Sequence, residues 1–341
     1  MTHKNNPHIA IVGAGSIGCY LGGCLAVAGA KLSLIGRVRI YQQIDTYGLQ
    51  VSDYKGREAK IELEKLDFST SMQSIAAADY VLLTVKSGDT KQAALDIKSY
   101  LKADAVIVSM QNGIRNVDVL SEVLPEHTVL KGMVPFNVLS KGKGQFHCGT
   151  EGDLAIEVKA DEHLALVQAF SAAELPVTLY NDIRGVQWGK LVMNLNNSVN
   201  ALSGAPLLEQ LNDREYRKVM TKVVSEALDV LKVAGITPAR TGKVIPKLTP
   251  YILALPNFLF KRVASATLKI DPQARSSMYE DFVLKRKTEI DYLNGEIVLL
   301  AQQHQTTAPV NKVIVELVKK AQEQQQGSPQ LSAKFLQHAI S

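Results

Sequence analysis

An amine and several amides occupy a stretch of the chain, residues 188–200, that otherwise has the composition of an apolar helix. Lys190, Asn194 and Asn197 are spaced i, i+4 and i+7, which places their side chains within about 60° of one another on a helix. A buried polar group without a partner costs about 1–3 kcal/mol, so something must satisfy this polar stripe. The pattern indicates either a buried polar network or a substrate pocket in which the lysine amine acts as an acid.

A glycine-rich turn near the start of the chain follows a short apolar strand at residues 8–13 and opens a helix of small residues. In a dinucleotide-binding turn the first glycine permits a tight bend, the second lets the backbone approach a pyrophosphate, and the third allows close packing of helix and strand. The N-terminus of the following helix faces the phosphate charge. We predict a dinucleotide site here, with a turn that binds no ligand as the alternative. Its residues are Gly13, Ala14, Gly15, Ser16, Ile17 and Gly18.

The end of the second predicted strand, residues 31–35, indicates which dinucleotide is bound. An NAD site usually has Asp or Glu at this point, where the carboxylate holds the ribose 2′-hydroxyl. Here the sequence continues with Gly36-Arg37-Val38-Arg39, and the first acid is Asp45. An arginine fork matches a 2′-phosphate, which a carboxylate would repel. We therefore predict NADP(H) as the cofactor and Arg37 as its 2′-phosphate ligand; two solvated surface arginines are the alternative.

The composition is that of an ordinary globular protein that handles small molecules. Hydrophobic residues make up 46% of the chain and charged residues 21%, as is typical of soluble proteins. A net charge of +5 without a block of Lys and Arg argues against nucleic-acid binding and suits an anionic cofactor and substrate. No apolar run reaches the ~18 residues needed to span a bilayer, so we expect no membrane association. The histidines are scattered without metal-ligand spacing, and we predict no metal site.

The three cysteines, Cys19, Cys24 and Cys148, form no Cys-x-x-Cys pair and are odd in number. Free thiols of this kind fit a reduced compartment. A strand that begins by residue 8 leaves no room for a signal peptide before it. We expect a cytoplasmic protein.

At 341 residues the chain is long enough for two domains. Strand and helix patterns alternate up to residue 158, which predicts a Rossmann-type, doubly wound α/β sheet. Helical patterns dominate from residue 182 onward. We therefore predict an NADP-binding domain at residues 1–181 and an all-helical substrate and catalytic domain at residues 182–341.

Long apolar patterns in the second half predict helices at residues 186–201, 215–234, 278–303 and 309–325. The proline-rich stretch 237–274 is predicted as a broken helical insertion. Its apolar segment at residues 258–264 is expected to pack within the domain or at the interface of a homodimer, and not on a membrane surface. The Gln- and Ser-rich tail after residue 322 is expected to fray.

Five motifs follow one another along the chain. They are Gly13-x-Gly15-x-x-Gly18, Thr84-Val-Lys86, Gln111-Asn112-Gly113, Trp188-x-Lys190-Leu-x-x-Asn194, and Ser276-Ser277-Met278 followed by Thr288-Glu289-Ile290-Asp291-Tyr292-Leu293-Asn294-Gly295. In this order they resemble the ketopantoate reductase (2-dehydropantoate 2-reductase) family over residues 8–320. The resemblance implies a Rossmann domain, a helical C-terminal domain and an active site in the cleft between them. It also implies the reduction of 2-dehydropantoate to (R)-pantoate with NADPH, a step towards pantothenate and coenzyme A.

The resemblance further implies roles for individual residues. Lys190 matches the general acid, and Glu289 matches the ligand of a substrate hydroxyl. Lys86 and Asn112 match residues at the nicotinamide end of the cleft, where Asn112 also reaches the substrate. From the residues alone, Lys86 could equally be a solvated lysine at a strand end, and Asn112 could belong to a plain turn. Glu289 could form a surface ion pair with one of the cations three and four residues before it.

Asn194 and Ser277 match substrate-binding positions of the family. The family commonly has an asparagine eight residues after the catalytic lysine; here that position is Ser198, preceded by Asn197, and either residue could take the role. Ser277 lies twelve residues before Glu289, about 120° round an ideal helix, so one straight helix would not aim both at one point. We infer that Ser277 lies at or before the start of its helix, where it or its neighbour could also serve as a simple N-cap.

Three functions remain open from the sequence. The first is the reduction of 2-dehydropantoate, the second is the reduction of another small 2-oxo acid on the same architecture, and the third is a non-catalytic NADP(H)-binding sensor with a protein partner. A sensor has no need of a proton donor, so the combination of Lys190, Asn194 and Glu289 favours an enzyme.

Overall fold

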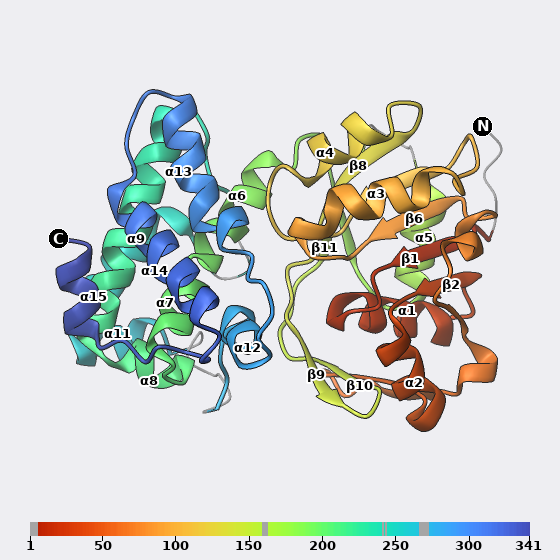
Figure 1. Cartoon of the computed structure of the whole chain (residues 1–341), viewed down its shortest axis with the longest axis horizontal. Coiled ribbons are helices and arrows are strands. Elements are labelled where there is room, and N and C mark those ends of the chain that lie inside the picture. The colour runs from red at the N-terminus through yellow and green to blue at the C-terminus, as the bar shows by residue number, and fades with distance from the viewer. Residues whose placement is uncertain (1–5, 159–162, 241, 243, 266–272) are drawn as a thin grey trace. The chain divides into compact units, whose positions relative to one another are not determined.

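The computed structural model of the chain describes residues 6–158, 163–240, 242, 244–265 and 273–341. The chain divides into two compact units, Met1–Ile183 and Arg184–Ser341. This division lies close to the domain boundary predicted at residue 181. Figure 1 shows strands and helices in the first unit and helices in the second.

An eight-stranded sheet forms the centre of the first unit (Figure 1). Its strands lie in the order β12 (Val177–Tyr180), β11 (Leu154–Glu157), β8 (Thr128–Met133), β7 (Val106–Ser109), β6 (Tyr80–Leu83), β1 (Ile9–Val12), β2 (Leu32–Ile35) and β5 (Asp67–Ser69). Neighbouring strands are parallel, except that β8 and β11 are antiparallel. Because the chain winds outward from β1 in both directions, the predicted doubly wound sheet is confirmed.

Each face of this sheet carries its own hydrophobic core. The covering helices are α1 (Ser16–Val27), α3 (Thr90–Lys98), α4 (Asn116–Val123) and α5 (Leu164–Ala172). Ile9 and Ile11 of β1 pack with side chains of α1 and α5, whereas Ala10 and Val12 pack with α3 and α4. Burial on both faces explains why these strands are continuous apolar runs in the sequence.

A second sheet of four strands completes the first unit. Its order is β4 (Glu58–Ile61), β3 (Leu49–Asp53), β10 (Gln145–Cys148) and β9 (Val138–Gly142). The sequence does not reveal β9 or the parallel pairing of β3 with β10. Small residues of α1 let this sheet approach closely, since a Cβ on Gly23 would lie 2.4 Å from a methyl carbon of Val51.

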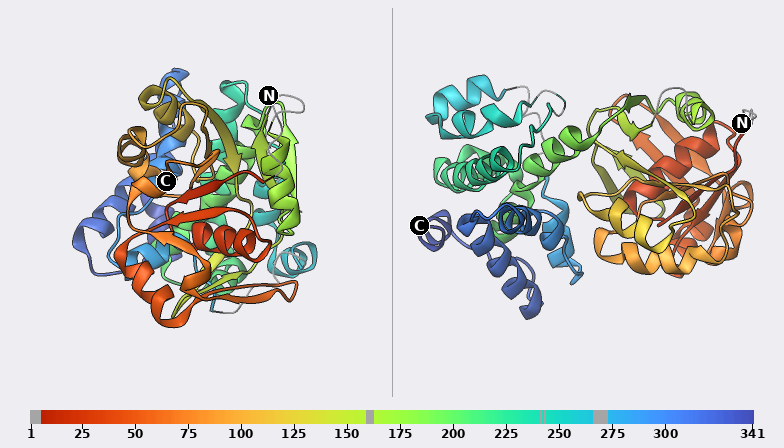
Figure 2. Two further views of the ribbon diagram at one scale, coloured as in Figure 1. Left: turned by 90° about the vertical axis from the view of Figure 1, so that its right-hand side faces the viewer. Right: turned by 90° about the horizontal axis from the view of Figure 1, so that it is seen from above.

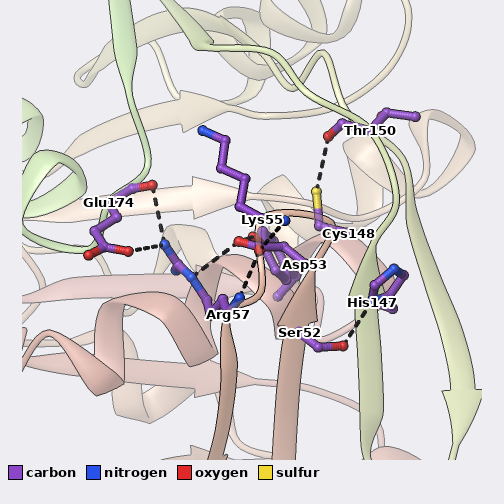
Figure 3. A network of polar contacts seen from close by, with 9 residues as sticks. Ser52, Asp53, Lys55, Arg57, His147, Cys148, Thr150 and Glu174 are labelled. Carbon is purple, nitrogen blue, oxygen red and sulfur yellow. Dashed lines mark hydrogen bonds and ion pairs between the residues drawn. The ribbon is translucent and has the colours of Figure 1, made fainter.

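Polar contacts hold the turn of this second sheet (Figure 3). The Asp53 carboxylate accepts hydrogen bonds from the backbone N–H groups of Lys55 at 2.9 Å and Arg57 at 3.0 Å. The Arg57 guanidinium pairs with Asp53 at 3.4 Å and with Glu174 at 3.2 Å, which ties the turn to the loop after α5. Beside the turn, burial raises the pKa of the Cys148 thiol. All three cysteines are buried and free, as expected for structural thiols.

The second unit contains helices and no strand among its described residues (Figure 2). They are α6 (Arg184–Asn194), α7 (Asn196–Ser203), α8 (Leu207–Asn212), α9 (Arg214–Val233), α10 (Thr249–Ala254), α11 (Asn257–Val263), α12 (Ser277–Val283), α13 (Asn294–Gln303), α14 (Pro309–Gln324) and α15 (Ala333–Ala339), with 3-10 turns η4 (Pro246–Leu248) and η5 (Ile290–Tyr292). The long helix α9 lies at the centre and contacts α10, α13, α14 and α15. In the described part of the chain, no helix combines the length and the apolar character needed to cross a membrane.

Two of the predicted long helices are interrupted. The helix predicted at residues 186–201 divides at Leu195 into α6 and α7, although Leu195 keeps helical angles of φ −59° and ψ −25°. The Ser198 hydroxyl donates to the Leu195 carbonyl at 2.8 Å and so competes with the helical hydrogen bonds. The continuous helix predicted at residues 278–303 is wrong, because α12 ends at Val283 and Lys285 adopts a left-handed conformation with φ 51°. The apolar pattern continues across this break because Ile290 of the 3-10 turn η5 and Leu293 directly after it are buried.

The insertion at residues 237–274 is helical and broken, as predicted, where the structure describes it; residues 241, 243 and 266–272 lie outside the described residues. Arg217 of α9 is fully buried and fastens the insertion. Its guanidinium donates to the carbonyls of Leu253 at 3.0 Å and Leu255 at 2.9 Å and lies over the ring of Phe260 at 4.2 Å. The apolar segment at 258–264 therefore packs within the unit through Phe260.

The prediction that the tail after residue 322 frays is wrong. The Tyr216 hydroxyl donates to the Leu331 carbonyl at 2.9 Å, and the Leu331 N–H donates to Leu202 at 2.8 Å. Leu336 of α15 is fully buried. Apolar residues spaced along a polar tail give it a helix that packs on α9.

Candidate functional site

The glycine-rich turn joins β1 to α1 at the edge where the parallel strands end. Gly13 has φ 112°, and a Cβ there would lie 2.7 Å from the backbone N of Val85. A Cβ on Gly18 would lie 2.2 Å from the Gly13 carbonyl oxygen and 2.7 Å from Thr84 Oγ1. The bend and the packing of α1 therefore require these two glycines. At Gly15, which is exposed, the nearest atom to an added Cβ is 4.0 Å away, so the space before this glycine is open.

The N-terminus of α1 has the character of an anion site. Gly15 is the N-cap and offers no side chain, and the first turn contains no acid. Ser16 and Ile17 are partly exposed there, whereas Ala14 is buried and uses its N–H on Ile35 at 3.0 Å. N–H groups of a first helical turn without a side-chain cap attract negative charge.

Arg37 follows β2 after Gly36 and is the N-cap of α2 (Val38–Tyr47). Its side chain is 88% exposed and forms an ion pair with Asp89 at 3.3 Å. Asp89 ends the 3-10 turn η3 (Ser87–Asp89), which follows β6. The sequence does not reveal this partner, because nothing in the spacing of two exposed residues indicates their contact.

Lys86 and Asn112 follow β6 and β7, which are neighbours in the sheet. Both side chains are partly exposed. The Ser87 hydroxyl donates to the Asn112 carbonyl at 2.6 Å, and Asn116 Nδ2 donates to the same carbonyl at 2.5 Å. Gly113 has φ 89°, so the Asn112-Gly113 pair does form a turn. These contacts hold the two loops side by side.

Buried polar side chains support this pair of loops. Gln111 Nε2 donates to the Val85 carbonyl at 3.0 Å and to Thr90 Oγ1 at 2.8 Å. Thr90 Oγ1 in turn lies 2.9 Å from Asn116 Oδ1. Gln111 belongs to one of the sequence motifs, but its positioning role and those of Thr90 and Asn116 depend on contacts that the sequence does not reveal.

In the second unit, Lys190 of α6 and Glu289 lie close enough to interact electrostatically. Burial lowers the pKa of Lys190 to about 8, and the Glu289 carboxylate acts in the opposite direction. Glu289 is the N-cap of η5 and is partly buried. The left-handed residue Lys285 separates Glu289 from α12, so the helical spacing on which a surface ion pair would depend is absent. Asn194 follows Lys190 by one turn on the same face of α6 and is partly exposed.

The remaining candidates gather where α7 meets α12. Ser276 is the N-cap of α12, accepting from the Tyr279 N–H at 3.2 Å, and its hydroxyl donates to the Asn197 carbonyl at 3.0 Å. Ser277 is the first residue of α12 and is exposed, which confirms its inferred place at the helix start. Asn197 is partly exposed, whereas Ser198 is fully buried with its hydroxyl donated to the backbone.

Asn200, which the sequence analysis did not select, joins the two helices. Its Nδ2 donates to the Ala205 carbonyl at 2.9 Å and to Gln210 Oε1 at 2.8 Å, and its Oδ1 accepts from the Ser276 N–H at 2.8 Å. It is fully buried. Part of the polar character of residues 188–200 is therefore structural. The described residues contain no group of three or more His, Cys, Asp or Glu side chains that could hold a metal ion.

Family models match both units of the chain. The model "Ketopantoate reductase PanE/ApbA" matches residues 9–160, and "Ketopantoate reductase PanE/ApbA C terminal" matches residues 182–322. The chain belongs to the ketopantoate reductase family. It is thus an oxidoreductase, and the resemblance stated from the five motifs is confirmed.

Relatives and solved structures agree with this family. The 2-dehydropantoate 2-reductase of Pyrococcus abyssi is 30% identical over 323 residues, and that of Pyrococcus horikoshii is 28% identical over 333; each alignment covers 91% of this chain and 96% of the relative. The crystal structure of a PanE/ApbA family ketopantoate reductase from Ralstonia eutropha JMP134 has a TM-score of 0.80 at 30% identity, covering 94% of this chain and 99% of that one. D-mandelate dehydrogenase, solved with NADH and anilino(oxo)acetate, has a TM-score of 0.75 at 23% identity over 93% and 99% of the two chains, and so shares the fold.

Proposed function

We propose that this family member is a 2-dehydropantoate 2-reductase that uses NADPH and forms (R)-pantoate, with Lys190 as the general acid. The names of the relatives support the substrate. The observation that carries the proposal is the interaction of Lys190 with Glu289, in which burial lowers the pKa of the lysine to about 8. Perturbed lysines of this kind gather at functional sites.

The chemistry follows from that pKa. Hydride addition to a ketone leaves negative charge on the carbonyl oxygen unless a proton is supplied. At pH 7 a lysine with a pKa of about 8 is mostly protonated, so Lys190 can stabilise this charge and donate its proton. It is a stronger acid than an ordinary lysine, whose pKa is about 10.4. Glu289 keeps Lys190 protonated and accepts a hydrogen bond from the substrate hydroxyl.

The first unit fits a nicotinamide dinucleotide. The open space at Gly15 and the uncapped N-terminus of α1 would hold the pyrophosphate, and Arg37 would hold the 2′-phosphate. Lys86 and Asn112 would lie at the nicotinamide end of the cofactor, because ligands of open α/β sheets bind at the carboxyl ends of the parallel strands. When bound, NADPH supplies the hydride. NADPH is favoured over NADH because Arg37 stands where an NAD site has an acid.

Substrate contacts are proposed for Asn112, Asn194, Asn197 and Ser277. Of the two candidates for the family's further asparagine, Asn197 suits the role better, because Ser198 is fully buried and donates its hydroxyl to the backbone. This difference from the family pattern favours a second candidate function, the reduction of another small 2-oxo acid on the same architecture.

The experiment that tests the proposal measures NADPH oxidation with 2-dehydropantoate, with its analogue lacking the 4-hydroxyl, and with a panel of other 2-oxo acids. A site built to bind a hydroxyl rejects an analogue without it by up to about 10⁴-fold in kcat/KM. We expect Glu289→Ala to narrow this difference by damaging the hydroxylated substrate more than its analogue. If the wild-type protein does not distinguish the two, or another 2-oxo acid is reduced faster, the proposed substrate is wrong. NADPH binding without turnover of any 2-oxo acid would identify a sensor.

A further inference from the structure

A cavity of about 270 Å³ lies in the helical unit where α12 and α14 end. The residues of its lining that bear on its chemistry are Lys285, Arg286, Lys287, Gln322, Glu323 and Gln325. None of them belongs to the proposed active site. Small-molecule sites usually have volumes of about 300–1,000 Å³, so this cavity suits a compact ligand.

The lining is positively charged. The lining contains three consecutive cations, Lys285, Arg286 and Lys287, and one acid, Glu323, so its basic residues outnumber its acidic ones. Within the described part of the chain, neither Lys285 nor Arg286 forms an ion pair. Cations often gather at a helix C-terminus to satisfy its carbonyls. Here backbone N–H groups already satisfy two of these carbonyls. The N–H of Lys285 donates to the Phe282 carbonyl at 3.1 Å, and the N–H of Arg286 donates to the Asp281 carbonyl at 2.8 Å. The side chains of Lys285 and Arg286 are therefore available to a ligand.

Two residues of the lining adopt a conformation that favours glycine. Lys285 and Gln325 each have φ 51°, in the left-handed region. A glycine would end a helix at this position without the steric cost that a longer side chain imposes. Such costs are most often retained at ligand sites. The lysine at position 285 therefore carries a backbone cost that a glycine would avoid.

Gln322 adds an oriented hydrogen-bond donor. Its Oε1 accepts from the Thr288 N–H at 2.8 Å and from the Thr288 hydroxyl at 3.0 Å. This holds the amide, and its Nε2 has no acceptor among the described residues. Thr288 directly precedes Glu289, so the amide connects the cavity to the residue that interacts with Lys190.

We propose that this cavity binds a compact metabolite bearing one or two phosphate groups, and that its occupancy regulates the enzyme through Thr288 and Glu289. Arg286 and Lys285 would contact the phosphate oxygens, since guanidinium and ammonium groups both bind phosphate. Gln322 Nε2 would donate a further hydrogen bond. The binding site stands on the geometry above, whereas the regulatory effect rests on the proposed function.

The test is a calorimetric titration of inorganic pyrophosphate into the full chain in the presence of saturating NADP⁺, which occupies the dinucleotide site. We expect Lys285→Gln/Arg286→Gln to raise the Kd for pyrophosphate at least tenfold, because the loss of even one charge-assisted contact has about that effect. The matched control is Lys261→Gln/Arg262→Gln, an exposed pair with the same charge change in the last turn of α11, which should bind as the wild type does. Absence of binding at millimolar pyrophosphate, or equal weakening in both variants, would overturn the site.

A second variant separates lost contacts from lost folding. Lys285→Gly removes the left-handed side chain, so we expect a higher melting temperature together with weaker pyrophosphate binding. Unchanged affinity in this variant would remove Lys285 from the site. The final readout is the rate of NADPH oxidation, which pyrophosphate should change in the wild type and not in Lys285→Gln/Arg286→Gln. Binding without a change in rate would contradict the regulation and retain the site, and a protein without any turnover would contradict the proposed function alone.

Discussion

Removing the carboxylate of Asp89 is expected to tighten the binding of NADPH. In the structure this carboxylate occupies the Arg37 guanidinium at 3.3 Å, where we propose that a 2′-phosphate binds. With 88% of the Arg37 side chain and 55% of the Asp89 side chain exposed, water weakens the pair. Exposed ion pairs contribute about 0.2–1 kcal/mol. Asp89→Asn should therefore lower the KM for NADPH by up to about fivefold.

The assay compares initial rates with NADPH and NADH in the wild type, Asp89→Asn, Arg37→Ala and the double variant. Arg37→Ala removes a charge-assisted contact of about 1.5–3 kcal/mol, so the KM for NADPH should rise roughly ten- to a hundredfold while that for NADH stays nearly unchanged. Asp89→Asn should lose most of its effect in the Arg37→Ala background, because both act through one contact. Its benefit should also shrink in ~1 M salt, where the Debye length is about 3 Å.

Two results would refute this reasoning. An equal fall in KM for both cofactors in Asp89→Asn would mean that Asp89 acts on its loop and not on the 2′-phosphate. Equal affinities of the wild-type protein for NADPH and NADH would remove Arg37 from the cofactor site altogether.

Three further predictions test the proposed general acid Lys190, its partner Glu289 and the glycine-rich turn. Lys190→Ala should lower kcat by about 10²–10⁴-fold, while NADPH binding, followed by fluorescence, should be retained. A variant that keeps more than about a tenth of the wild-type kcat would show that another group donates the proton. In the proposed mechanism the protonated amine is the active form, and its pKa is about 8, so kcat should fall as pH rises through about 8. Glu289→Gln removes the charge that raises this pKa, so the fall should move to lower pH; a pH profile that does not move would contradict the pairing. Gly18→Ala places a Cβ 2.2 Å from a carbonyl oxygen and should cost about 1–3 kcal/mol in urea unfolding. Gly15→Ala, with its nearest atom at 4.0 Å, should keep its stability but raise the KM for NADPH, and equal destabilisation of both variants would contradict the roles of the glycines.

The α/β unit could be predicted because its signals are local. The bend at Gly13 and the close packing at Gly18 depend on residues that lie within one turn of sequence or directly across the neighbouring strand. Continuous apolar runs predicted most of the remaining strands, and apolar residues at helical spacing predicted most of the remaining helices. The contact of Arg37 with Asp89 could not be predicted, because the two exposed side chains are separated by 52 positions and neither has a pattern that depends on the other.

The candidate site was only partly accessible to sequence reasoning. The resemblance selected Lys190 and Glu289 together, whereas spacing alone allowed a helical ion pair between Glu289 and Lys285 or Arg286. The left-handed backbone of Lys285 removes that alternative. The role of Asn200 was hidden as well, because an amide that joins two helices has the same sequence signature as one that binds a substrate.

The interruption between α12 and α13 determines where the candidate residues can lie. A continuous helix would separate Ser276 from Glu289 by thirteen residues, about 20 Å along its axis. The residues that they meet on α6 and α7, Asn197 and Lys190, are only seven positions apart, about 10 Å along a helix. Ser276 reaches Asn197 through a hydrogen bond, and Glu289 reaches Lys190 electrostatically. The left-handed turn at Lys285 breaks the helix between Ser276 and Glu289, so the spacing of one straight helix does not fix where these two residues lie.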